Sequence, residues 1–209
     1  MQVFGLTGGL ASGKSSVAAH WRQRGLPVLD ADALAREIVA PTESALGELA
    51  AEFGSEVLRD GQLDRKRLAQ LVFGHPERLR RLEAITHPRI LALRTRRLAE
   101  LEAAGEPLVC SEVPLLYEKG LEAELRPIVV VTVPDALQRQ RARERDGSSL
   151  AEVEARLAAQ LPLAEKQRRA DYVIDNQGTR AATLEQADRV LLQICQGLGV
   201  DPRRYGYAD

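Results

Sequence analysis

A glycine-rich stretch near the N-terminus, residues 5–17, reads GLTGGLASGKSSV. In such a loop the glycines let the backbone turn, so that several N–H groups converge on phosphate oxygens. A lysine at its end neutralises β- and γ-phosphate oxygens, and the serine that follows offers a hydroxyl ligand to Mg²⁺. Four residues fit the spacing G-x-x-x-x-G-K-[ST] that this chemistry needs: Gly8, Gly13, Lys14 and Ser15.

The residues on either side of this loop predict the elements that hold it. MQVFGL, residues 1–6, is mostly apolar with the β-formers Val3 and Phe4, and SVAAHWRQR, residues 16–24, is mostly good helix formers. The start of the predicted helix directs its positive end at a bound anion. The order of strand, loop and helix therefore disfavours the alternative, a glycine-rich turn without a ligand.

Five short apolar runs are expected to form parallel strands. The clearest is IVVVTV, residues 128–133, because a continuous valine-rich run fits a strand covered on both faces. Helical patterns separate the runs, which predicts an α/β fold with a five-stranded parallel sheet and helices on both faces. The expected strands are residues 2–6, 27–29, 107–110, 128–133 and 172–174.

Two long intervals between these strands read as insertions. Residues 32–105 hold no convincing strand and predict an inserted helical lobe. Residues 138–169 predict two charged helices around a turn at Asp146, Gly147 and Ser148. The expected core is residues 1–31, 106–137 and 170–200, and the tail, residues 201–209, is uninformative.

The composition narrows the class of protein. Charged residues make up 28% of the 209 residues and the net charge is −1, so we expect neither disorder nor binding to nucleic acid. The sequence has no run of eighteen apolar residues and no signal peptide, so we expect a cytoplasmic protein without a membrane partner. Cys110 and Cys195 lie in apolar settings and are expected to be buried free thiols.

Three carboxylates follow predicted strands and so belong at the carboxyl end of the sheet, near the loop. Asp30 or Asp32 can accept the proton of a hydroxyl that attacks a γ-phosphate. The alternative for either aspartate is to cap the following helix. Glu112 could hold water on a metal, or it could only pair with a nearby arginine.

A phosphate loop alone does not separate a kinase, a motor ATPase and a GTP switch. The guanine-specific signature Asn-Lys-x-Asp is missing, because the only asparagine of the chain is Asn176 and Gln177 follows it. A GTP switch is thereby disfavoured.

Six segments in this order closely resemble those of the dephospho-coenzyme A kinases over about residues 2–178: GLTGGLASGKSSVA, DADALARE, ITHPRI, VPLLYE, RARERD and ADYVIDNQG. The resemblance implies a P-loop kinase that uses ATP and Mg²⁺. It would phosphorylate the 3′-hydroxyl of dephospho-CoA, the last step of coenzyme A synthesis. The alternatives are a kinase of the same fold acting on a nucleoside, a nucleotide or shikimate, and a nucleotide-binding protein without catalysis. For the oligomeric state, the sequence allows a monomer or a small homo-oligomer.

The resemblance also implies roles for residues. Asp32 would be the catalytic base, with Lys14 and Arg141 as further catalytic residues, and residues 138–169 would form a lid. Nucleotide would bind to Ala11, Ser12, Gly13, Lys14, Ser15, Ser16, Arg145 and Asn176, with Mg²⁺ on Ser15 and, through water, on Glu112. The acceptor would meet Asp30, His87, Pro88, Arg89, Pro114, Leu115, Leu116 and Tyr117. The roles of Arg139 and Arg143 stay open.

The chain departs from the family pattern at two positions of the loop. Ala11 stands where a glycine is usual, and Ser16 where a threonine is usual. Alanine does not easily adopt a positive φ, so the loop geometry at Ala11 is the feature to inspect first.

Overall fold

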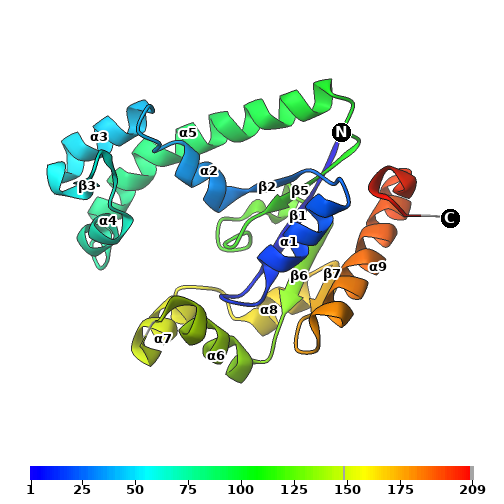
Figure 1. Ribbon diagram of the computed structural model, residues 1–209. Helices are drawn as coiled ribbons and strands as arrows, with labels where there is room; N and C mark the ends of the chain where they lie inside the picture. The colour runs from blue at the N-terminus through cyan, green and yellow to red at the C-terminus, as the bar shows by residue number, and fades with distance from the viewer. Residues whose placement is uncertain (148, 208–209) are drawn as a thin grey trace. The chain divides into compact units, whose positions relative to one another are not determined.

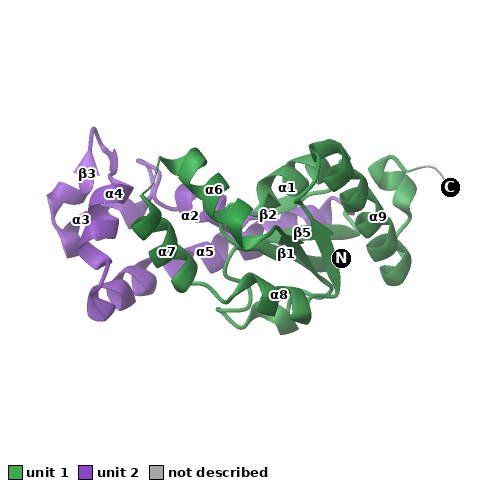
Figure 2. Ribbon diagram, turned by 90° about the horizontal axis from the view of Figure 1, so that it is seen from below, with its two compact units in different colours: residues 1–29, 106–209 green, residues 30–105 purple. Residues whose placement is uncertain are grey.

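The computed structural model describes residues 1–147 and 149–207 (Figure 1). Ser148 of the predicted turn and the last two residues of the tail lie outside the described residues. The chain divides into two compact units (Figure 2): unit 1 is Met1–Leu29 with Glu106–Asp209, and unit 2 is Asp30–Gly105. The first boundary falls two residues before the expected one, and residues 138–169 belong to unit 1 rather than to a unit of their own.

A five-stranded sheet has the strand order β2-β5-β1-β6-β7, with β1 at its centre. β1 pairs in parallel with β5 and with β6, and β6 pairs in parallel with β7. Every predicted strand is present, so the predicted fold class is confirmed. The strands are β1 (Gln2–Gly8), β2 (Val28–Asp30), β5 (Leu108–Glu112), β6 (Ile128–Thr132) and β7 (Tyr172–Asp175).

The helices of unit 1 follow the strands of the sheet. Three helices occupy the interval in which two were predicted, because Pro162 separates α7 from α8 and a capping box of Ser149 and Glu152 starts α7. The described helices are α1 (Lys14–Gln23), α6 (Asp135–Asp146), α7 (Leu150–Ala158), α8 (Leu163–Arg169) and α9 (Arg180–Leu198), with the short η2 (Leu121–Ala123) and η3 (Pro202–Tyr205).

Strand β6 shows why the sheet is covered on both faces. Val129 and Val131 pack in the core cluster that contains residues of α1 and α9. Ile128 and Val130 point to the opposite face, into a cluster with Leu163 of α8. Because successive side chains of a strand alternate between faces, a continuous apolar run needs apolar partners on both sides.

Unit 2 is mainly helical, with Leu34, Leu49 and Leu93 in its core. The prediction that it holds no strand was wrong at one place. Two short strands pair around Asp60 and Gly61, which have positive φ angles of 53° and 74°, a turn that Asp-Gly favours. The elements are α2 (Ala31–Glu37), α3 (Ser44–Phe53), η1 (Ser55–Val57), β3 (Leu58–Arg59), β4 (Gln62–Leu63), α4 (Arg65–Val72) and α5 (Pro76–Ala103).

The C-terminal segment, which the sequence left without interpretation, packs on the core of unit 1. Tyr205 is fully buried and Tyr207 nearly so. The Tyr207 hydroxyl donates to Asp188 Oδ1 over 2.6 Å, and His20 Nε2 lies 2.6 Å from the same oxygen. Arg24 Nη2 donates to Asp188 Oδ2 over 2.7 Å. Asp188 therefore joins α1, α9 and the chain end.

This cluster predicts a pH-dependent contribution to stability. Burial raises the pKa of Asp188, but hydrogen bonds from Tyr207, Arg24 and His20 outweigh it and hold the pKa below its ordinary value. Because the folded pKa is the lower one, the stabilisation is present at neutral pH and is lost as the pH falls below about 4. We expect Asp188→Asn to lower the free energy of unfolding by about 1–3 kcal/mol at pH 7.

Urea unfolding from pH 7 to pH 3 measures this effect. The difference between the wild type and Asp188→Asn should shrink below about pH 4. Glu185→Gln is the control, because Glu185 forms an exposed ion pair with Arg189 on the same helix and should contribute little. A difference that stays constant down to pH 3 contradicts the assignment.

Both cysteines are buried and free, as predicted. Burial raises the pKa of the Cys195 thiol to about 11 and shifts that of Cys110 upward as well. Among the helices of the described residues, none is long and apolar enough to span a membrane.

Candidate nucleotide site

The loop between β1 and α1 depends on glycine at its two consensus positions. Gly13, which precedes α1, has a φ of 97°, and a Cβ atom there would lie 2.0 Å from Asn176 Nδ2. A Cβ atom on Gly8 would lie 2.5 Å from the carbonyl oxygen of Val131. The glycines therefore allow both the left-handed turn and the close packing of the loop against its neighbours.

Ala11 adopts the positive φ that a glycine, but not an alanine, adopts easily. Its φ is 52°, in the left-handed region where an L-residue with a Cβ atom is strained. The loop therefore keeps its turn at some cost in stability.

We expect Ala11→Gly to raise the free energy of unfolding by about 0.5–1 kcal/mol, the relief of the strain less the greater entropy of the unfolded glycine chain. Urea unfolding measures the change. The matched control is Ala19→Gly on the exposed side of α1, which should lower the free energy of unfolding by about 0.5–1 kcal/mol. A loss of stability in Ala11→Gly would show that the alanine is not strained.

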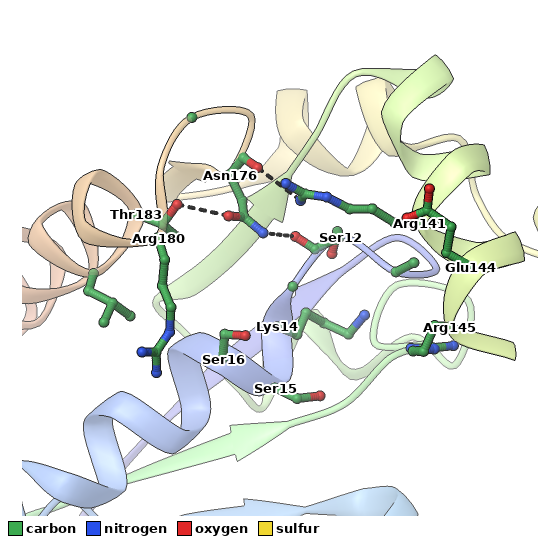
Figure 3. Close-up of a pocket in the computed structure, with 14 residues that line it drawn as sticks. Ser12, Lys14, Ser15, Ser16, Arg141, Glu144, Arg145, Asn176, Arg180 and Thr183 are labelled. Carbon is green, nitrogen blue, oxygen red and sulfur yellow. Dashed lines mark hydrogen bonds between the residues drawn. The ribbon is translucent and has the colours of Figure 1, made fainter.

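A cavity of about 640 Å³ opens over this loop (Figure 3). Its lining comes from the loop and the start of α1, from α6, from the segment that joins β7 to α9, and from the start of α9. The structure thus brings together the predicted nucleotide-binding residues and Arg141. The lining residues are Ala11, Ser12, Gly13, Lys14, Ser15, Ser16, Arg141, Glu144, Arg145, Asn176, Gly178, Arg180, Thr183 and Leu184.

Lys14 lies half-buried at the first position of α1. Its Nζ donates to the carbonyl oxygen of Gly9 over 2.8 Å and to that of Gly8 over 3.3 Å. These bonds hold the ammonium over the loop, where it can exchange carbonyl oxygens for those of a phosphate.

Asn176 was predicted to contact adenine, but its amide is engaged within the protein at both ends. Nδ2 donates to the Ser12 carbonyl oxygen, and Oδ1 accepts from Thr183 Oγ1, each over 2.8 Å. The main-chain oxygen of Asn176 accepts from Arg141 Nη1 over 3.0 Å. In this structure Asn176 therefore positions the loop and Arg141.

Ser15 and Glu112, which were predicted to serve Mg²⁺ together, lie close to each other. Ser15 Oγ donates to Glu112 Oε1 over 3.5 Å, and Glu112 is 5% exposed at the end of β5. Arg22 Nη2 lies 3.9 Å from Glu112 Oε2, so the alternative pairing with an arginine also occurs. No cluster of three or more His, Cys, Asp or Glu side chains exists among the described residues, but Mg²⁺ on one hydroxyl, waters and substrate phosphates needs none.

The arginines of α6 differ in their partners. Arg145 makes two hydrogen bonds to Asp146, of 2.7 Å and 2.9 Å. These bonds and one from Arg156 hold the pKa of Asp146 well below its usual range. Arg139 donates to Glu154 of α7 over 2.6 Å, which gives it a structural role in joining α6 to α7.

A family model described as dephospho-CoA kinase matches residues 2–182. The chain belongs to the dephospho-CoA kinase family. It is therefore a kinase of coenzyme A biosynthesis, whose final step this family carries out.

Individual relatives agree with the family match. The chain is 54% identical over 200 residues to a dephospho-CoA kinase of Anaeromyxobacter dehalogenans, covering 95% of each chain. The dephospho-CoA kinase structure from Campylobacter jejuni has a TM-score of 0.69 at 29% identity and covers 94% of this chain and 99% of its own. A gluconokinase from Sinorhizobium meliloti, with a TM-score of 0.51 at 18% identity, covers 94% of this chain and 95% of its own and shares the fold.

Two residues of this kinase that were predicted to contact the acceptor are buried in unit 1. Leu116 is fully buried and Tyr117 is 6% exposed, both in the core cluster with Ile128. Both side chains have apolar core partners within unit 1, so these two residues of VPLLYE pack against the sheet. Pro114 and Leu115 are half-buried, and the Pro114 carbonyl oxygen accepts from Lys166 Nζ over 3.1 Å.

Asp30 and Asp32 have different environments. Asp30 caps α2, because its Oδ1 accepts from the backbone N–H of Asp32 over 2.8 Å and of Ala33 over 3.1 Å. The Asp32 side chain is exposed in the first turn of α2. The geometry therefore supports a cap at Asp30, and it leaves the Asp32 carboxylate free of that task.

The ITHPRI residues lie within α5 of unit 2. Pro88 is inside the helix, and the His87 side chain is 53% exposed, with Nε2 3.7 Å from Glu83 Oε1. His87 is thus neither a helix cap nor a core residue. Arg89 pairs with Glu48 and donates to the Ile85 carbonyl oxygen over 2.6 Å.

The sequence interpretation missed five lining residues of the kinase. A helix that follows a parallel strand starts at the carboxyl edge of the sheet, so the first turn of α9 had to lie near the loop. That rule could have found the residues from α9. The five are Glu144, Gly178, Arg180, Thr183 and Leu184.

Proposed function

We propose that this kinase transfers the γ-phosphate of ATP to the 3′-hydroxyl of the ribose of dephospho-CoA, giving coenzyme A and ADP. The observation that carries the proposal is the cavity in which a phosphate loop, Lys14 and Arg141 converge. The choice of acceptor rests on the family to which the chain belongs.

Each group in the cavity has a task suited to its chemistry. Backbone N–H groups of the loop and the N-terminus of α1 bind the phosphates of ATP. Lys14 neutralises the β- and γ-phosphates. Arg141, which Asn176 holds by a hydrogen bond to its guanidinium, stabilises the charge on the phosphoryl group in transit.

Asp32 is the general base of this proposal. Its carboxylate takes the proton of the 3′-hydroxyl as that oxygen bonds to the γ-phosphorus, and the bond from phosphorus to the bridging oxygen of ADP breaks. Asp30 does not fit this task equally well, since one of its oxygens already accepts two backbone N–H groups.

Acceptor binding is assigned to unit 2. A hollow of about 320 Å³ there is lined by two arginines, two glutamates, a serine and three apolar residues: Arg89, Arg96, Glu37, Glu43, Ser44, Ile38, Ala92 and Leu93. Guanidinium groups suit a diphosphate, and apolar side chains suit the pantetheine arm of dephospho-CoA. The Arg89 side chain is held by Glu48, which orients it for this role.

Mg²⁺ would be held by the Ser15 hydroxyl and, through water, by Glu112. When bound, it neutralises charge on the β- and γ-phosphates during transfer. The lid, residues 138–169, excludes water, which would otherwise compete with the acceptor. We place the reaction in the cytoplasm, in keeping with two unpaired thiols, and propose a monomer or a small homo-oligomer.

An acceptor panel tests the proposal. ADP release from ATP is measured with dephospho-CoA, shikimate, gluconate, a nucleoside and a nucleoside monophosphate as separate acceptors. Dephospho-CoA should give turnover at least about 10²-fold above the others, because the acceptor site is built for its polar groups. Turnover with another acceptor and none with dephospho-CoA would contradict the assignment of dephospho-CoA as the substrate.

A further inference from the structure

The nucleotide cavity holds a basic side chain that the roles above leave unused. Among the described residues that line it, the basic ones are Lys14, Arg141, Arg145 and Arg180, and the acidic one is Glu144. Lys14, Arg141 and Arg145 each donate to an acceptor of the protein. Arg180 makes no hydrogen bond or ion pair with any residue of 1–147 or 149–207.

Arg180 is also poorly placed for the stability of its own helix. It is the first residue of α9, and the first turn of that helix holds no acidic side chain. A positive charge at a helix N-terminus is disfavoured by the helix dipole, whereas an anion there is favoured. An anionic ligand beside Arg180 would satisfy both the guanidinium and the helix end.

The position of Arg180 in the cavity indicates which part of the nucleotide it meets. Arg180 and Ser16 both line the cavity, and Figure 3 draws the Arg180 guanidinium on the side of Ser16, whereas the Lys14 ammonium points the other way, towards α6. A phosphate-loop lysine serves the β- and γ-phosphates, and the loop amides cradle the α- and β-phosphates. The Arg180 end of the cavity is therefore the α-phosphate end.

A second polar group in the lining of the cavity has no partner. Ser12 is fully buried, and its Oγ has no hydrogen-bond partner among the described residues. Unpaired buried polar atoms are costly, so the loop as well as Arg180 carries a polar group that the protein itself leaves unsatisfied.

We propose that Arg180 binds the α-phosphate of the nucleotide, which makes it a nucleotide-binding residue of the kinase. The inference rests on the proposed function, because it takes the cavity to be the ATP site. The α-phosphate keeps its charge when the γ-phosphate leaves. Arg180 therefore binds ATP, the transition state and ADP alike, and its loss falls on the KM for ATP rather than on kcat.

Calorimetry with ATP, ADP and adenosine tests the proposal without an acceptor present. In Arg180→Ala the Kd values of ATP and ADP should rise by the same factor, about tenfold, as for a lost charge-assisted hydrogen bond. Adenosine, which lacks the phosphate, should bind as it does to the wild type. Arg180→Lys should recover most of the affinity, because a lysine restores the charge.

Arg189→Ala is the matched control. Arg189 lies further along α9, is exposed and pairs with Glu185, and its loss should leave the Kd values and turnover unchanged. Unchanged ATP and ADP affinity in Arg180→Ala overturns the inference. So does an equal loss for adenosine, with Arg180→Lys as weak as Arg180→Ala, since the guanidinium would then pack on the base. Turnover of dephospho-CoA by the wild type is measured separately, so a wrong acceptor does not affect this result.

Discussion

Asp32→Asn should lower kcat for dephospho-CoA by about 10²–10⁴-fold while the Kd for ATP stays the same. The amide cannot accept the proton of the attacking hydroxyl, but it keeps the size and the hydrogen-bonding reach of the carboxylate. The exposed position of Asp32 in α2 means that the variant should fold normally. Single-turnover kinetics at saturating ATP and acceptor give the change in the chemical step, and calorimetry gives ATP affinity.

Asp30→Asn is the matched variant. Asparagine caps helices about as well as aspartate, so α2 should be retained and kcat should fall much less than in Asp32→Asn. Unchanged turnover in Asp32→Asn would remove this residue from the mechanism. A larger loss in Asp30→Asn would exchange the roles of the two aspartates.

Lys14→Ala should lower kcat/KM for ATP by about 10³-fold or more, because it removes the positive charge beside the β- and γ-phosphates. The side chain is half-buried and contributes hydrogen bonds to Gly8 and Gly9 rather than core packing, so the protein should stay folded. Steady-state kinetics measure the loss, and circular dichroism checks the fold.

Lys119→Ala controls for the general effect of losing a lysine from unit 1. Lys119 is exposed and does not line the nucleotide cavity, so its variant should keep full activity. A Lys14→Ala protein with wild-type kcat/KM would show that the cavity over residues 8–13 is not the ATP site.

The sheet and the phosphate loop could be predicted because their signals are local. Residues 128–133 form an apolar run that needs cover on two faces, and the structure supplies it with α8 on one side and α1 and α9 on the other. The spacing of Gly8, Gly13 and Lys14 fixes a backbone shape within the seven residues 8–14. Elements with such local patterns can be predicted without knowing which distant residues contact them.

Other features depended on which residues become neighbours in space. The motif VPLLYE was predicted to line a site, but Leu116 and Tyr117 have core partners that only the folded sheet provides. Likewise, the role of Tyr207 depends on Asp188 and Arg24, which lie far from it in sequence. Apolar and aromatic residues suit both a ligand site and a protein core, so residue type alone could not show which of the two they form.

The division of labour between Asp30 and Asp32 was left open for a similar reason. Both are aspartates at the start of one helix, and either could have been the cap. The backbone decided, because the extended conformation of Asp30, with φ −94° and ψ 114°, lets its side chain reach the N–H groups of the next turn.

The phosphorylated position of the product tests the central claim most directly. Wild-type protein is incubated with ATP, Mg²⁺ and dephospho-CoA, and the product is examined by phosphorus and proton NMR. The account predicts one new phosphate monoester, coupled to the 3′ proton of the ribose, in an amount equal to the ADP formed. A phosphate on another oxygen, or ADP release with dephospho-CoA left unchanged, would contradict it.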